Sequence, residues 1–190
     1  MRKASHEFPL RVLSALRTKL APGYHELPQC RDQPLVLFVA PFFESGVTTY
    51  VDQSLFPVLY GMPGFWDTAK AFFNLQGAEH VSGVLFCNGF TVPRFQRAAV
   101  DWESLDGRWQ GTCFTDEDPG VPYEFAFPFG TPGIPREEWH TGVTFFENPN
   151  ARVRVPANVL PATCRVAVEH GKIKKEVSGF HPVSTWTIFW

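Results

Sequence analysis

Leucine residues recur at a helical spacing near the start of the chain. Within residues 9–21 an apolar side chain returns every three or four positions, and arginine and lysine lie off that face. Pro9 suits the first turn of a helix, and the Pro-Gly pair that follows this segment would end it. The pattern predicts an amphipathic helix over residues 9–21. Its expected buried face consists of Leu10, Leu13, Leu16 and Leu20.

Three short runs are apolar without alternation, which is typical of strands buried on both faces of a sheet. Helices are predicted between them, over residues 52–60 and 91–100, while residues 65–75 fit either a strand or a loop. This order predicts an α/β fold: a mixed sheet with parallel central strands flanked by helices. The three runs are residues 35–40 (LVLFVA), expected as a central strand, 81–87 (VSGVLFC) and 143–146 (VTFF).

The remaining segments favour β-structure. Residues 105–140 are rich in glycine and proline, and we interpret them as a loop and β-hairpin excursion from the main sheet. Residues 165–169 and 173–177 are predicted to form a hairpin around a His-Gly turn, and residues 185–190 a last strand. A length of 190 residues suits a single α/β domain over residues 1–190.

Composition limits the classes of function. The net charge is −2 and the isoelectric point about 6.3, so nucleic-acid binding would require a local basic patch. The first residues lack the apolar stretch of a secretory signal, and no run of about 20 apolar residues is present. We therefore expect a cytoplasmic, bacterial-type protein without membrane association. The scattered cysteines predict reduced, mostly buried thiols rather than a metal site: Cys30, Cys87, Cys113 and Cys164.

The stretch EHVSGVLFCNGFTVPRFQRAA, residues 79–99, predicts a buried strand, a turn and a short helix. The free N–H groups at a helix start attract anions, and two arginines three residues apart share one helix face. The alternative is an ordinary strand-to-helix corner, with solvated arginines that pair with Asp101 or Glu103. The predicted anion-binding residues are Asn88, Gly89, Thr91, Arg94 and Arg97.

Ligand sites in α/β sheets usually lie beyond the carboxyl ends of the strands. This rule selects three loops, residues 41–49, 88–97 and 147–154. Glu44, in the first loop, is a candidate general base or metal ligand. The alternative for this loop is a plain turn at its Ser-Gly pair. We predict no metal site.

Several catalytic and cofactor motifs are absent from the sequence. It contains no G-x-S-x-G elbow, no glycine-rich nucleotide loop and no H-E-x-x-H pair, so we expect no cofactor. His80 and Cys87 stand seven residues apart on one predicted strand, about 20 Å at 3.3 Å per residue, and cannot form a catalytic pair. A pairing of Cys87 with His140 or His181 stays open.

Three segments carry a resemblance to a known group of proteins: residues 7–44, 79–98 and 143–161. They resemble an uncharacterised bacterial family whose longer members look like PD-(D/E)XK nuclease-type domains. The resemblance implies that the helix at residues 9–21 and the strand at residues 35–40 follow the catalytic hairpin of that fold, which would lie before Met1. It therefore implies a context of nucleic-acid processing and places no catalytic residue on this chain.

These observations lead to one functional expectation and two alternatives. We expect a non-catalytic α/β module of a nuclease-like family that supports nucleic-acid or protein-partner binding. The first alternative is a small hydrolase or transferase with a site near Glu44, Asn88 and Arg94, and the second is an interaction or immunity-type protein. A basic strip that aligns Arg94 and Arg97 with Arg152 would favour the binding module. A closed pocket with convergent glutamate and histidine side chains would favour the hydrolase or transferase.

The anion-binding corner generates the first prediction. Replacing Arg94 and Arg97 together by alanine should weaken oligonucleotide binding. The slope of the logarithm of the binding constant against the logarithm of the salt concentration should become shallower by about one for each lost phosphate contact. Fluorescence anisotropy over a salt titration measures both effects, and thermal unfolding should barely change. An oligonucleotide that does not bind the parent protein, or a double variant that unfolds, would make the corner structural.

Overall fold

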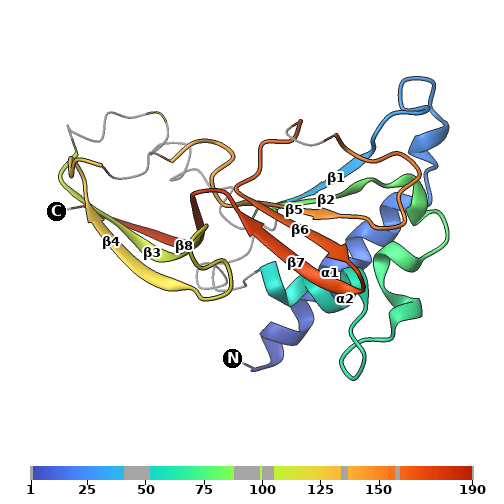
Figure 1. Cartoon of the computed structure of the whole chain (residues 1–190), viewed down its shortest axis with the longest axis horizontal. Coiled ribbons are helices and arrows are strands. Elements are labelled where there is room, and N and C mark those ends of the chain that lie inside the picture. Colours follow the sequence, from blue (N-terminus) through green and yellow to red (C-terminus); the bar gives the residue numbers. More distant parts are fainter. Residues whose placement is uncertain are drawn as a thin grey trace.

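Two β-sheets meet in the molecule, and helices cover one face of the larger sheet (Figure 1). The computed structural model describes residues 2–40, 52–87, 99, 105–133, 137–156 and 159–189. The described part contains a mixed sheet of five strands, an antiparallel sheet of three strands and two α-helices. The α/β class and the mixed sheet predicted from the sequence are therefore confirmed.

The helix α1 (Arg2–Leu20) begins seven residues earlier than predicted, so Pro9 lies inside it. Its buried face contains Phe8, Val12, Leu13 and Leu16. Leu10 is 45% exposed, and its assignment to this face is wrong. Because residues two apart on a helix do not share a face, a side chain between Phe8 and Val12 turns toward solvent.

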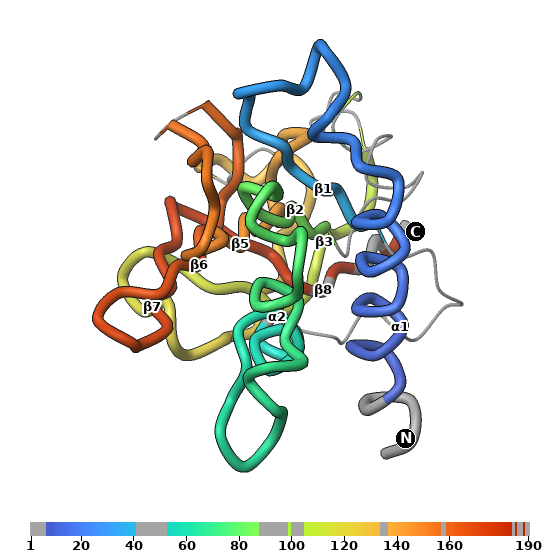
Figure 2. The backbone as a smooth tube through the Cα atoms, turned by 90° about the vertical axis from the view of Figure 1, so that its right-hand side faces the viewer, coloured from blue at the N-terminus to red at the C-terminus, as the bar shows by residue number. Residues whose placement is uncertain are grey.

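Short helical turns fill the rest of the helical layer. The helix α2 (Phe56–Tyr60) follows a 3₁₀ turn at Asp52–Leu55, and together they occupy the segment predicted as a helix. Residues 65–75, which fit either a strand or a loop, contain 3₁₀ turns instead. The remaining turns are Tyr24–Glu26, Thr68–Lys70, Phe72–Asn74 and Ala78–His80. Figure 2 shows α1 and α2 side by side against the sheet.

The larger sheet has the order β1-β2-β5-β6-β7. β1 pairs parallel with β2, and β5 parallel with β6, but β2 and β5 are antiparallel, as are β6 and β7. The predicted parallel centre is therefore wrong at the β2–β5 pair. The strands are β1 (Val36–Val39), β2 (Gly83–Cys87), β5 (Val143–Glu147), β6 (Cys164–Glu169) and β7 (Lys172–Val177).

The reversal at β5 moves one of the three selected loops. Residues 147–154 leave the sheet where β2 begins, whereas residues 41–49 and 88–97 follow the opposite ends of β1 and β2. The buried Asn148 fixes this turn, because its amide donates to the carbonyl oxygens of Ala78 at 2.8 Å and Val81 at 2.7 Å. The carboxyl end of β5 therefore lies at the opposite edge of the sheet from the carboxyl ends of β1 and β2.

The position of β1 also differs from the prediction. β1 lies at one edge of the sheet in the described part of the chain, and Phe38 is 50% exposed. The apolar run at residues 35–40 therefore marks a half-buried edge strand rather than a central one. The central strands are β2 and β5, and almost all of their residues are buried.

The smaller sheet joins two distant parts of the sequence. Residues 105–140 contain a hairpin of β3 (Gly107–Thr115) and β4 (Tyr123–Pro128). β8 (Phe180–Phe189) pairs antiparallel with β3, which gives the order β4-β3-β8. The hairpin is thus part of a second sheet. Trp109 and Phe125 form its aromatic core, with ring centroids 4.9 Å apart, and Phe180 packs 5.0 Å from Phe125.

The main core lies between the larger sheet and the helices. Tyr60 crosses this layer, and its hydroxyl group lies 3.0 Å from the carbonyl oxygens of both Glu147 and Val166, which accept its single hydrogen between them. Burial raises the pKa of Tyr60 well above its ordinary value, so the phenol stays protonated. The buried members of the core include Phe8, Leu16, Leu55, Leu59, Phe72, Phe73, Val84, Phe86 and Phe146. Neither helix in the described residues has the length and hydropathy that a membrane crossing demands.

The centre of the sheet generates the second prediction. A Cβ atom on Gly83 would overlap the ring of Phe145 and lie 2.5 Å from the carbonyl oxygen of Phe146. Gly83→Ala should therefore destabilise the protein by about 1–3 kcal/mol, the usual cost of overpacking. Urea unfolding measures the change, and Gly120→Ala, where the nearest atom lies 3.7 Å away, is the matched control. Equal midpoints for both variants would contradict the described packing.

Candidate functional site

The residues predicted as site residues lie outside the described part of the structure. This holds for all five members of the anion-binding corner and for the candidate acid or base: Asn88, Gly89, Thr91, Arg94, Arg97 and Glu44. Their segments follow neighbouring strand ends, because Val39 of β1 pairs with Phe86 of β2. Arg152 does not adjoin this end, since its backbone N–H donates to Glu79 at 2.8 Å, before β2 begins. Because Arg94 and Arg97 lie outside the described residues, the basic strip that would align them with Arg152 stays a prediction.

A cavity of about 800 Å³ lies between the two sheets. Its volume falls within the range of about 300–1,000 Å³ that is typical of ligand sites. One wall comes from the larger sheet, another from the connection between β5 and β6, and a third from the turn after β3. The lining residues are Asp116, Pro119, Phe145, Val155, Pro156, Leu160, Ala162, Thr163, Arg165, Lys175, Glu176, Val177 and Ser178.

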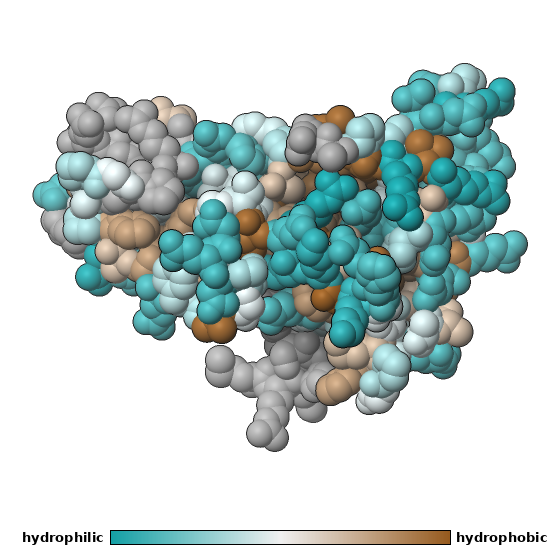
Figure 3. Space-filling model, viewed as in Figure 1, coloured by the Kyte–Doolittle hydropathy of each residue, from teal (hydrophilic) through white to brown (hydrophobic). Residues whose placement is uncertain are grey.

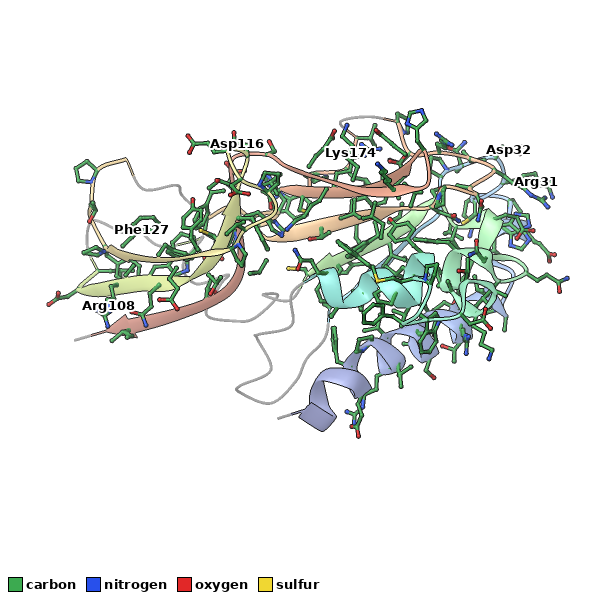
Figure 4. The ribbon with its side chains drawn as sticks, turned by 60° about the horizontal axis from the view of Figure 1, so that its bottom comes forward. Arg31, Asp32, Arg108, Asp116, Phe127 and Lys174 are labelled. Carbon is green, nitrogen blue, oxygen red and sulfur yellow. The ribbon has the colours of Figure 1, made fainter. Side chains whose placement is uncertain are left out.

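Strand register places the polar and aromatic side chains of the cavity together. Phe145 pairs directly with Arg165, and Arg165 with Glu176, so the three side chains share the face of the sheet away from the helices. Phe145 is buried, and Glu176 is exposed at the rim. Figure 4 shows Asp116 at the junction of the two sheets and Lys174 on the side of β7 away from α1 and α2. The cavity thus has an apolar floor and a charged rim.

Arg165 is held in a fixed orientation beside this floor. Its Nε and Nη2 atoms both lie 3.2 Å from Oε2 of Glu147. Its guanidinium carbon lies 5.5 Å from the centroid of the Phe145 ring, within the range of a cation–π contact. The side chain is 32% exposed, so solvent reaches it. An ion pair and a ring therefore position a cation at the cavity wall.

Lys175 connects β7 with the smaller sheet. Its ammonium nitrogen lies 3.0 Å from the centroid of the Phe114 ring. Phe114 belongs to β3 and is buried. A cation over an aromatic face gains about 2 kcal/mol or more when it is desolvated. This contact links a residue of the cavity lining to the smaller sheet.

A buried histidine joins the segments behind the cavity. Nδ1 of His181 lies 2.8 Å from the hydroxyl of Thr163, and Nε2 lies 3.3 Å from the hydroxyl of Thr144. The Thr163 hydroxyl also accepts a hydrogen bond of 2.8 Å from the backbone N–H of Gly142. The imidazole is fully buried. Because Thr163 also lines the cavity, this network fixes part of its floor.

A second cluster lies at the opposite end of the larger sheet. The rings of His25 and His80 stack with centroids 3.5 Å apart and an interplanar angle of 14°. Glu79 lies 3.7 Å from His80 and 3.3 Å from Arg152, and Glu26 lies 4.0 Å from His25. The cluster joins the turn after α1 to the segments that flank β2 and β5. Among the described residues, no group of three histidine, cysteine or acidic side chains is arranged to hold a metal ion.

The environment of this cluster shifts two pKa values. Burial lowers the pKa of His80, and the neighbouring His25 and Arg152 lower it further. The pKa of Glu79 is also lowered, chiefly by a hydrogen bond from its own backbone N–H. The folded state therefore favours a neutral His80 and an ionised Glu79.

The described cysteines are free thiols, and Cys87, Cys113 and Cys164 are buried, as the sequence predicted. Burial raises the pKa of Cys113 to about 11, so this thiol remains protonated at neutral pH. Cys87 ends β2 with no measurable exposure. His140, one of its candidate partners, lies 3.3 Å from Glu138.

Sequence reasoning missed the residues that shape the cavity. Arg165 is the one charged residue among the alternating positions of the CRVAV stretch, which is a signal of a polar group on a half-buried face. Thr163 and His181 carried no comparable signal, because their contact depends on how two sheets meet. The stacked histidines lie 55 positions apart in the chain, 80 against 25, and only the fold brings them together. No family model, curated protein or solved structure matches the chain.

The histidine cluster generates the third prediction. A His80 pKa below its unfolded value makes a contribution to stability that is fully present above about pH 6.5 and is lost as the pH falls through the folded pKa. Urea unfolding should therefore show declining stability as the pH falls below about 6.5, and His80→Gln should make that decline shallower. The effect of Glu79 lies at lower pH, near its unfolded value of about 4.3.

The control for this prediction is His170→Asn, in the exposed turn between β6 and β7. Asparagine tolerates the left-handed backbone of that turn, where φ is 51°. This variant should keep the pH dependence of the parent. Identical pH profiles for the parent and His80→Gln would contradict the role of His80.

Proposed function

We propose that the chain is a non-catalytic α/β binding module, and that the cavity between its sheets receives an extended segment of a partner protein. The observation that carries the proposal is that consecutive residues of one strand line the cavity. Successive side chains of a strand point to opposite faces, so a cavity over one face contacts every second residue. Lys175, Glu176 and Val177 of β7 and Ser178, which follows the strand, all line this cavity. The cavity therefore borders the edge of β7.

The hydrogen-bond pattern of β7 supports docking at this edge. The backbone N–H of Ser178 donates to Thr163 at 2.9 Å, which marks these two as a hydrogen-bonded pair. Hydrogen-bonded pairs alternate with non-hydrogen-bonded pairs along an antiparallel ladder. Val177 and Ile173 belong to non-hydrogen-bonded pairs, so their backbone N–H and C=O groups point away from β6. An extended peptide binds a sheet edge through groups of this kind.

The charged groups of the cavity suit recognition rather than chemistry. Arg165 is paired with Glu147, Lys175 lies on Phe114, and Glu176 lies 2.7 Å from Lys174. Fixed partners hold these groups in place, whereas a general acid or base needs access to a substrate proton. The surface over β7 is mainly hydrophilic (Figure 3), as expected for the rim of a protein-binding site.

A protein partner suits the described surface better than a nucleic acid. Several of its basic side chains already have carboxylate partners, which would repel phosphate groups. These are Arg11, Lys70, Arg152 and Lys174. Within this proposal, the resemblance to nuclease-type domains supplies the context: the module would bind a protein that acts with a nuclease, and would cleave nothing itself.

Selection of displayed peptides tests the proposal and is the fourth prediction. Random peptides selected on the parent protein should bind with micromolar affinity, and Ala162→Trp, which fills the cavity, should weaken them by at least about tenfold, or about 1.4 kcal/mol. Ala69→Trp, at an exposed position in a 3₁₀ turn, is the matched control and should bind like the parent. Calorimetry measures the affinities, and thermal unfolding shows that both variants fold.

Two outcomes would contradict the proposal. One is the absence of enriched peptides, and the other is equal binding by the parent and Ala162→Trp. An oligonucleotide that binds the parent with steep salt dependence, and that binds Ala162→Trp equally well, would instead favour the nucleic-acid function expected from the sequence.

A further inference from the structure

The geometry points to Arg165 as a carboxylate-binding residue, which anchors an acidic group borne on an apolar body inside the cavity. This inference rests on the proposed function and names the chemistry that the cavity selects. It begins from the way the guanidinium group is held. The edge of the guanidinium group formed by Nε and Nη2 faces a single oxygen atom of Glu147. The Phe145 ring makes a cation–π contact with the same group.

The donors of Arg165 exceed its described acceptors. A guanidinium group carries five N–H donors, and the contacts with Glu147 use Nε and Nη2. Among the described residues Arg165 has no other hydrogen-bond acceptor. The end of the fork, formed by Nη1 and Nη2, has the geometry that binds a carboxylate with two parallel hydrogen bonds. A second carboxylate can therefore bind without displacing Glu147.

The surroundings of Arg165 define the rest of the ligand. Phe145 and Val155 are buried in the floor, and Leu160 is half-buried in a wall. They offer apolar contact next to the guanidinium group. The other charged lining residues are Lys175, whose ammonium group lies on the Phe114 ring, and two carboxylates, Asp116 and Glu176, of which Glu176 is paired with Lys174. Together they match a side chain or small molecule that carries an apolar body and a terminal carboxylate, and a neutral analogue would leave the Arg165 fork without its partner.

Prior positioning is the physical reason to expect selectivity. An arginine that is free in solvent loses rotamer entropy when it binds a ligand. Glu147 and Phe145 already restrict Arg165 in the unliganded protein. A carboxylate ligand therefore meets a donor fork that is already oriented, the arrangement that improves affinity through preorganisation.

A matched pair of probes tests this inference and provides the fifth prediction. The probes are 3-phenylpropionate and 3-phenylpropionamide, which share an aromatic body and differ in the charged group. Titration followed by protein NMR should show the acid binding at least about tenfold more tightly than the amide. Arg165→Gln should abolish that difference, and Arg165→Lys should retain part of it, because lysine keeps the charge but lacks the fork. Arg11→Gln, at an exposed ion pair of α1, should behave like the parent.

The outcomes separate this inference from the proposed function. Equal binding of acid and amide, both weakened by Ala162→Trp, would overturn the role of Arg165 and leave the binding cavity standing. Failure of both probes would also overturn the inference, and the peptide selection then decides the cavity by itself. Thermal unfolding of the Arg165 variants checks that they fold. If Arg165→Gln unfolds, the acid–amide comparison in Arg165→Lys decides: an undiminished preference for the acid would contradict bidentate binding.

Discussion

The buried imidazole of His181 is the contact on which the arrangement of the two sheets depends. It belongs to the smaller sheet, and its two nitrogen atoms meet threonine hydroxyls at the start of β5 and just before β6. A buried polar group must be matched with partners, because an unsatisfied one costs about 1–3 kcal/mol. The requirement for two partners at once allows few relative positions of the sheets. The cavity is the space that this arrangement leaves between the sheets.

The reversal between β2 and β5 gives the larger sheet two different ends. At one end, β1 and β2 finish beside the start of β5 and β6, and the cavity and the smaller sheet lie there. At the other end, Asn148 and the stacked histidines join the segments that enter β2 and leave β5. The rule that ligands bind beyond the carboxyl ends of parallel strands thus selects the end with the cavity, although the lining comes mainly from β5, β6, β7 and their connections.

The pattern of apolar residues predicted the features that depend on neighbouring residues in the chain, such as the positions of strands and turns. The apolar runs at residues 81–87 and 143–146 contain strands, and the hairpin around His170 has the expected turn, with a left-handed backbone at that residue. The direction of β5 could not be inferred, because a run buried on both faces looks the same in either orientation. β1 was predicted to be central because its run of side chains is apolar. An apolar run does not indicate whether a second strand pairs with it, so the sequence could not show that β1 lies at an edge.

The candidate site was harder to predict than the fold, for a physical reason. Arg165, Glu147 and Phe145 come from two strands, and their contact requires the register that pairs Phe145 with Arg165. A shift of one residue would turn Arg165 to the helix side, and the sequence alone does not contain that register. The contact between Thr163 and His181 requires in addition that one sheet packs against the other. Long-range geometry of this kind has no counterpart in residue spacing.

The smaller sheet is completed only when its last strand, β8, has been synthesised. β3 and β4 form a local hairpin, but β3 gains its second neighbour only from residues 180–189, about seventy positions later in the chain. A ribosome adds roughly 5–20 residues per second, so several seconds separate the two syntheses. During that interval β3 has an open edge, and Trp109 and Phe125 lack Phe180 in their aromatic cluster. An open strand edge and an incomplete aromatic cluster expose the nascent chain to aggregation after the hairpin emerges and before the last strand does.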